Sequence, residues 1–198
     1  MMLTDIAGLA GHASALAASI LLLPAVRRLS VPRYSVLIAS VFLLALVPLP
    51  SLPLAGYTRG MVGDLSLTTL LLIGLAILRP YGIVSVAKSR PQLLLVIAIV
   101  AIIFYPMTLG ISLSDPYRLG YSDARFFALV LLLALVASWR QSNLIVLSLT
   151  LATLAWSQGL YESSNWWDYF IDPLVAIYAL FYLAKRAVQR LHNGSDRR

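Results

Sequence analysis

Residues 92–111 read QLLLVIAIVAIIFYPMTLGI, a run without a charged side chain. About 20 residues of α-helix, rising 1.5 Å per residue, cross the roughly 30 Å hydrocarbon layer of a bilayer. Further apolar segments approach this length near residues 6–25, 35–54, 65–78, 125–139, 143–159 and 169–184, and the third, fourth and fifth of these six are short. The sequence therefore predicts about seven transmembrane helices.

The overall composition supports the same fold class. Hydrophobic residues make up 60% of the 198 residues, charged residues make up 12%, and the mean hydropathy is +0.86. Such a chain has too little polar surface to enclose a water-soluble core. We expect an all-α integral membrane protein, a compact bundle with one polytopic domain over residues 1–190, a basic cytoplasmic tail over 191–198 and no soluble domain. The chain has no cysteine, which excludes disulfides, thiol nucleophiles and sulfur-ligated metals.

The charges divide between the two sides of this predicted bundle. Twelve of the fifteen Lys and Arg residues fall in the connections after the first, third, fifth and seventh helices, leaving Arg59, Arg118 and Arg125 on the other side. Cytoplasmic loops carry the excess of cations, so the N-terminus is predicted outside and the C-terminus in the cytoplasm. This rule also explains the net charge of +7, and no nucleic-acid partner is predicted.

Seven of the eight acidic residues fall on the predicted outer side. Four of them, Asp5, Asp64, Asp123 and Asp172, stand at or near the start of an outside-to-inside helix. Aspartate accepts hydrogen bonds from the first free N–H groups of a helix, so these four are predicted N-caps. The remaining acids, Asp115, Glu162 and Asp168, are the better candidates for a functional site.

Residues 161–173 read YESSNWWDYFIDP and combine aromatic rings with carboxylates and amides. One interpretation is a sugar-binding surface, in which rings cover the apolar face of a sugar and polar groups bind its hydroxyls. The other is an aromatic belt, because Trp and Tyr gather at membrane interfaces without a ligand. The candidate binding residues in this loop are Glu162, Asn165, Trp166, Trp167 and Asp168.

The segment before the third predicted helix reads GYTRGMVGD over residues 56–64 and follows three prolines, at 48, 50 and 53. Proline and glycine interrupt helices, so we expect a broken helix end, a compact loop and a cavity near the outer surface. Arg59, with Arg118 and Arg125 from the next outer loop, is a candidate phosphate ligand. The alternative is that these arginines neutralise the neighbouring acids.

Polar residues are few in the predicted spans. Ala7, Gly11, Ala15 and Ser19 form a small-residue stripe suited to helix packing. His12 is an intramembrane candidate for proton transfer or hydrogen bonding, although a hydrogen bond to a neighbouring helix explains it equally well. Tyr105 and Pro106 predict a kink that opens space near the outer leaflet.

No G-x-S-x-G, H-E-x-x-H, P-loop or dinucleotide pattern occurs, and catalytic residues, a metal and a cofactor are not predicted. The leading hypothesis is an accessory subunit of cell-envelope biogenesis that binds a lipid-linked glycan or phospholipid headgroup. Alternatives are a small outer-leaflet enzyme using Glu162, Asp168 or Asp115, and a transporter or flippase. Compactness suggests the bacterial inner membrane, with membrane lipids and either a membrane-enzyme partner or a second copy as partners.

Overall fold

The computed structural model describes residues 3–82, 86–111 and 115–195, and their regular structure is helical. The long helices are α1 (Leu3–Ser19), α2 (Val31–Ala45), α4 (Leu67–Leu78), α5 (Arg90–Pro106), α6 (Ala124–Trp139), α7 (Asn143–Ser157) and α9 (Pro173–Ser195). The short elements are α3 (Leu54–Val62), α8 (Trp166–Phe170), the 3₁₀ turns η1 (Ile20–Leu22), η2 (Val26–Arg28), η3 (Arg79–Tyr81), η4 (Val86–Ser89) and η6 (Pro116–Tyr121), and the π turn η5 (Met107–Ile111).

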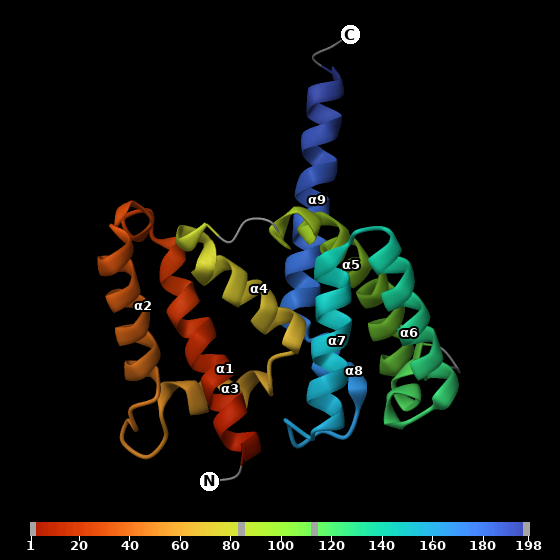
Figure 1. The fold of residues 1–198 in the computed structure, drawn as a ribbon, viewed down its shortest axis with the longest axis horizontal. Coiled ribbons are helices and arrows are strands. Elements are labelled where there is room, and N and C mark those ends of the chain that lie inside the picture. The colour runs from red at the N-terminus through yellow and green to blue at the C-terminus, as the bar shows by residue number, and fades with distance from the viewer. Residues whose placement is uncertain (1–2, 83–85, 112–114, 196–198) are drawn as a thin grey trace.

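The long helices run alternately up and down, so their connections gather at two ends of the bundle (Figure 1). One end holds the start of α1 and residues 46–66, 107–111, 115–123 and 158–172; we call it the acidic end. The opposite end holds residues 20–30, 79–82, 86–89 and 140–142; we call it the basic end. Helix α9 continues past the basic end, beyond the neighbouring helices (Figure 1).

Each of the seven apolar segments predicted from the sequence corresponds to a long helix. Two helical stretches, Thr4–Leu22 and Arg90–Ile111, are long and apolar enough to cross a membrane. The apolar helices Val31–Ala45, Leu67–Tyr81, Ala124–Trp139 and Asn143–Ser157 are shorter than that requirement. The all-helical fold is therefore confirmed, and two helices support a membrane protein by length and composition.

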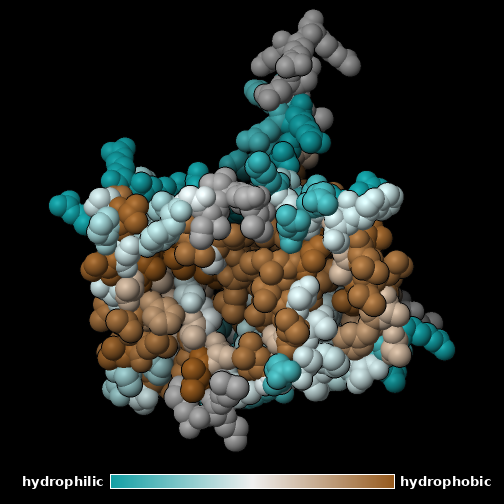
Figure 2. All heavy atoms as spheres, in the orientation of Figure 1, coloured by the Kyte–Doolittle hydropathy of each residue, from teal (hydrophilic) through white to brown (hydrophobic). Residues whose placement is uncertain are grey.

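On the face drawn in Figure 2, apolar side chains form a belt between the two more polar ends. Side chains exposed from the long helices include Ile102, Leu131, Leu132, Ile177 and Phe181. Water-soluble monomers rarely expose contiguous apolar patches larger than a few hundred Å². This surface is consistent with association of the protein with lipid.

Buried polar groups connect the helices within the bundle. Thr68 of α4 donates its hydroxyl proton to the carbonyl of Phe170 at 2.6 Å, and the hydroxyl of Ser148 in α7 lies 2.5 Å from the same Thr68 oxygen. Because Thr68 has one proton to donate, Ser148 donates to Thr68. These bonds join α4, α7 and the end of α8 where a lone hydroxyl would be costly to bury.

The segment between α2 and α4 differs from its prediction. Helix α2 ends at Ala45 rather than near residue 54, since the prolines that follow cannot continue its hydrogen bonding. Residues 54–62, expected within a broken helix end and compact loop, instead form α3, which Pro53 precedes and Gly63 ends with φ +82°. The prediction of an irregular loop over residues 56–64 was wrong because Gly56 and Gly60 are accommodated inside a helix.

Candidate functional site

Arg59 of α3 lies at the centre of a charged cluster at the acidic end. Its Nε atom donates to Asp64 Oδ1 at 2.7 Å and one terminal nitrogen donates to Asp64 Oδ2 at 3.2 Å, a two-pronged contact. The other terminal nitrogen donates to Asp5 Oδ1 at 3.2 Å. Glu162 Oε1 lies 3.8 Å from the guanidinium. One cation therefore joins carboxylates from α1, from the connection before α4 and from the loop after α7.

Gly8 of α1 makes room for this cluster. A Cβ atom at position 8 would lie 2.3 Å from Asp64 Oδ1 and 2.4 Å from Arg59 Nε. Real Cβ atoms do not approach other atoms so closely, so any side chain at position 8 would push the ion pair away. The absence of a side chain at Gly8 is what allows the ion pair to pack on α1.

His12 fixes the end of α3 against α1. Its Nε2 atom lies 2.7 Å from the carbonyl oxygen of Gly63, so Nε2 carries the donated proton. The His12 side chain is buried, and Gly63 itself donates its N–H to the Arg59 carbonyl at 2.8 Å. The sequence suggested either proton transfer or a hydrogen bond to a neighbouring helix for His12. The structure shows the hydrogen bond.

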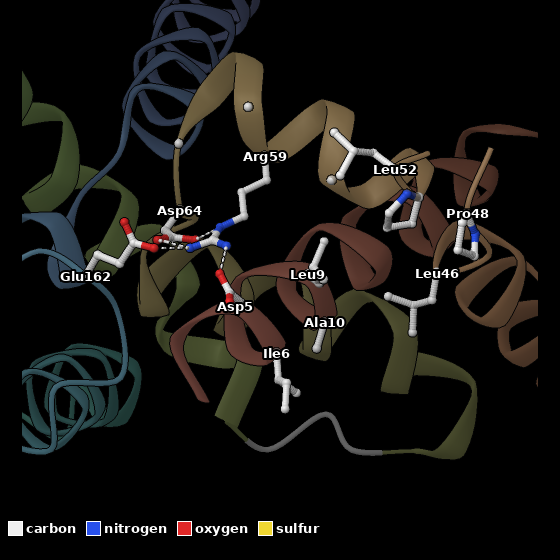
Figure 3. Close-up of a pocket in the computed structure, with 14 residues that line it drawn as sticks. Asp5, Ile6, Leu9, Ala10, Leu46, Pro48, Leu52, Arg59, Asp64 and Glu162 are labelled. Atoms are coloured by element: carbon white, nitrogen blue, oxygen red, sulfur yellow. Dashed lines mark hydrogen bonds and ion pairs between the residues drawn. The ribbon is translucent and has the colours of Figure 1, made fainter. Parts of the chain in front are cut away.

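A pocket of about 920 Å³ lies beside the Arg59 cluster. Figure 3 shows Arg59, Asp64, Asp5 and Glu162 together on one side of this pocket, with apolar side chains on the other. The apolar wall consists of Ile6, Leu9, Ala10, Leu46, Pro48, Leu52 and Pro53. The pocket therefore combines a charged end with an extended apolar wall, as a binding site for an amphipathic molecule requires.

Four charged side chains among the described residues line this pocket. One guanidinium lies among three carboxylates, and the formal charges of these four side chains sum to −2. The hydrogen bond to Asp64 raises the pKa of Arg59, burial opposes the rise, and Asp5 and Glu162 add to it, so the guanidinium stays protonated. The Glu162 side chain is 72% exposed, whereas that of Arg59 is 18% exposed, which places Glu162 at the solvent side of the cluster.

A smaller pocket of about 490 Å³ adjoins the first, because Gly63 and Asp64 line both. Asp168 lies in its wall, where Asp168 Oδ2 accepts hydrogen bonds from the Ser163 hydroxyl at 2.5 Å and from the Tyr117 hydroxyl at 2.9 Å. Burial and the bond to Asp168 raise the pKa of Tyr117, so Tyr117 stays a hydrogen-bond donor at neutral pH.

The space predicted near Tyr105 and Pro106 is this second pocket. Helix α5 ends at Pro106, the π turn η5 follows, and its Gly110 has φ +86°. Tyr105 and Thr108 line the pocket, with Asp172 on its wall as well. Its lining is richer in hydroxyl groups than that of the larger pocket.

No protein-family model, curated protein or solved structure matches this chain. The chemistry of the site is therefore interpreted from its own geometry. Within residues 3–82, 86–111 and 115–195, no group of three or more His, Asp or Glu side chains is placed to hold a metal ion.

The candidate binding residues from the sequence do not form one site. Arg59 and Glu162 meet in the larger pocket and Asp168 lines the smaller one. Asp115 caps η6 by accepting the Tyr117 N–H at 3.0 Å. Arg118 and Arg125 are exposed, and neither lines a pocket described above. The structure thus separates Arg118 and Arg125 from Arg59, with which they had been grouped.

The aromatic loop packs inward rather than presenting open ring faces. Trp166 is 1% exposed and stacks on Phe170, and Trp167 lies 4.5 Å from Phe104 between ring centres. Asn165 is fully buried, accepts the Trp167 N–H at 2.9 Å and donates to the Tyr117 carbonyl at 2.8 Å. These contacts hold α8 against η6, so in this structure they stabilise the fold.

Two of the four predicted N-caps are confirmed. Asp123 accepts N–H groups at the start of α6, and Asp172 accepts the Val175 N–H at 2.9 Å at the start of α9. Ser66, not Asp64, caps α4, and Asp5 lies inside the first turn of α1. The capping predictions for Asp5 and Asp64 were wrong because both carboxylates bind Arg59. The larger pocket thus includes residues that the sequence had assigned to helix ends.

Proposed function

We propose that this chain is a multi-pass membrane protein with about seven spans, and that its larger pocket binds a membrane lipid. The alternating long helices, the apolar belt and the cation-rich basic end support seven spans with the acidic end outside. The shorter helices cross by tilting less from the membrane normal, by locally thinning the bilayer or by extending into the flanking residues.

One observation carries the lipid-binding proposal: the larger pocket has a charged end and an apolar wall. Small-molecule sites commonly occupy roughly 300–1,000 Å³ and combine apolar walls with a few polar groups. The pocket volume of about 920 Å³ is within this range. The apolar wall suits an alkyl chain, and the Arg59 cluster suits a polar headgroup.

We assign a binding role in preference to catalysis. The carboxylates of Asp5 and Asp64 accept hydrogen bonds from Arg59, and Asp168 accepts from two hydroxyls. A general base needs a lone pair directed at a substrate proton, and of the acids in the larger pocket the exposed Glu162 is the one that keeps this role open for the enzyme alternative. A binding subunit that presents a lipid to an envelope-building enzyme requires no such group.

Two matched glycine substitutions test this proposal. Gly60 lines the larger pocket and Gly74 of α4 lies outside both pockets, and a Cβ atom at either position has no neighbour within 4 Å. Phenylalanine at position 60 should fill the pocket, whereas phenylalanine at position 74 should not. The measurement is native mass spectrometry of each purified variant, released from a mild detergent, to quantify retained lipid.

We expect wild type and Gly74→Phe to retain lipid and Gly60→Phe to lose most of it. Equal retention by Gly60→Phe and wild type, or no lipid on the wild type, would overturn the proposal. Conversion of retained lipid into a product of different mass would instead support the enzyme alternative.

A further inference from the structure

We propose that the larger pocket selects lipids whose headgroup carries a positively charged amine. This inference rests on the proposed lipid binding and adds the chemical class of the headgroup. It reverses the expectation that Arg59 would hold a phosphate.

The geometry of Arg59 argues against an anionic headgroup. Its Nε atom and both terminal nitrogens are directed at carboxylate oxygens within 3.2 Å, and a third carboxylate lies at 3.8 Å. A phosphate would have to displace one of these carboxylates and then lie among the remaining negative charges. Juxtaposed like charges disfavour binding and exclude wrong partners.

The same cluster favours a cationic headgroup. The formal charges of its four side chains sum to −2, and the most exposed carboxylate, that of Glu162, is also the one farthest from Arg59. An ammonium group has three N–H donors and no acceptor, and carboxylate oxygens are acceptors. The exposed carboxylate of Glu162 on the pocket wall therefore offers the oxygens that an ammonium group needs.

The apolar wall distinguishes a lipid from a free cation. Ile6, Leu9, Leu46 and Leu52 line the pocket opposite the charged cluster (Figure 3). A metal ion or a small free amine would gain nothing from these side chains, whereas an alkyl chain removes its own surface and theirs from water. The occupant that uses both sides of the pocket is an amphiphile with an amine at its polar end.

The test compares three short-chain phospholipids with identical tails: dioctanoyl phosphatidylethanolamine, phosphatidylcholine and phosphatidylglycerol. Binding to the purified full-length chain in neutral detergent at pH 7 and low salt is measured by native mass spectrometry. The ethanolamine lipid should bind roughly tenfold more tightly than the glycerol lipid, because the first has a donor cation and the second a net negative charge. Phosphatidylcholine, whose cation has no N–H donor, should fall between them.

Substitutions at Glu162 identify the group responsible. Glu162→Gln should reduce the preference for ethanolamine several-fold, and Glu162→Lys should shift it toward phosphatidylglycerol. Asp115→Asn is the matched control at the same end of the bundle, because Asp115 does not line the pocket, and it should leave the preference unchanged. Glu162 is largely exposed, so its variants should unfold at the wild-type temperature.

The outcomes separate this inference from the proposed function. Equal or tighter binding of phosphatidylglycerol, or a preference that survives Glu162→Lys, would overturn amine selection while lipid binding stands. Retention of none of the three lipids by wild type, or undiminished retention by Gly60→Phe, would overturn lipid binding itself. A several-fold loss of preference on Glu162→Gln, with Asp115→Asn unchanged, would support both.

Discussion

Gly8 and Asp64 are in direct packing contact: a Cβ atom on Gly8 would lie 2.3 Å from the Oδ1 atom of Asp64. Asp64 in turn holds Arg59 through two hydrogen bonds. The position of the charged cluster therefore depends on a residue of α1 that contributes no side chain to it.

Replacing Gly8 by alanine should destabilise the protein. The added methyl group must displace Asp64 and Arg59, and overpacking of this kind costs about 1–3 kcal/mol. Thermal unfolding in detergent measures the loss of stability. The lipid retention of this variant, measured by native mass spectrometry, should also be lower than that of wild type.

Gly60→Ala is the matched control, since its Cβ has no neighbour within 4 Å and Gly60 lies within a helix. Alanine in a helix interior is favoured over glycine by roughly 0.5–1 kcal/mol, so this variant should be slightly more stable than wild type. A Gly8→Ala variant as stable as Gly60→Ala would contradict the packing of the ion pair on α1.

Asp172→Ala should be among the most destabilising aspartate substitutions. The buried carboxylate accepts from the Ser66 N–H at 2.8 Å, the Thr69 hydroxyl at 2.5 Å and the Val175 N–H at 2.9 Å. Loss of a helix cap together with unpaired buried donors predicts a decrease of about 3–5 kcal/mol in the free energy of unfolding.

Asp115→Ala supplies the comparison for that experiment. Asp115 is exposed and accepts the N–H of Tyr117, so its loss should cost less than about 1 kcal/mol. Denaturant unfolding of both variants measures the difference. Similar losses for the two would contradict the buried role of Asp172.

Because of Tyr161, we expect the protein to become less stable at high pH. Burial, and secondarily the charge of Asp64, raises the pKa of Tyr161 above the ordinary value of 10.0. Because the folded-state pKa exceeds the unfolded value, this contribution is fully present below pH 10 and is lost as the pH rises above it. The free energy of unfolding should then fall by about 1.4 kcal/mol per pH unit for this proton.

Tyr161→Phe should remove that part of the slope. It also removes the 2.7 Å hydrogen bond to the Leu65 carbonyl, which should lower stability by an amount independent of pH between 7 and 9. Unfolding measured across pH 7–11 separates the two effects. If the free energies of unfolding of wild type and Tyr161→Phe fall in parallel above pH 10, the loss of stability at high pH does not come from Tyr161.

The orientation of the chain in the membrane can be measured with single-cysteine variants, because the sequence itself contains no cysteine. Ser51 is exposed at the acidic end and Gln189 is exposed on the part of α9 beyond the basic end. In intact spheroplasts a membrane-impermeant maleimide should label Ser51→Cys, and should label Gln189→Cys only after lysis. The reverse pattern would invert the proposed topology, and labelling of both before lysis would argue against a membrane-spanning bundle.

Local sequence properties predicted the long helices well. The run from residue 92 to residue 111 corresponds to α5 and η5, because a continuous apolar stretch depends little on what packs against it. Asp172 was also predicted correctly, since the adjacent Pro173 marks the first turn of a helix.

The charged cluster could not be predicted in the same way. Asp5 and Arg59 are 54 positions apart in sequence, and their contact depends on α3 packing against α1. The glycines of α3 suggested a loop, whereas the His12 bond to Gly63 and the packing of α3 on α1 accompany a helix there. Gly8 lies beside the predicted small-residue stripe rather than in it, and only the three-dimensional contact with Asp64 shows its importance.

Helix α9 is unbroken from Pro173 at the acidic end to the region beyond the basic end (Figure 1). At 1.5 Å per residue its 23 residues span about 35 Å. A small rigid domain joined to α9 in continuous helical register would therefore keep a fixed orientation relative to the bundle. That property makes the projecting helix a suitable attachment point for a fiducial marker in electron cryomicroscopy, where a protein of 21.6 kDa is otherwise too small to align.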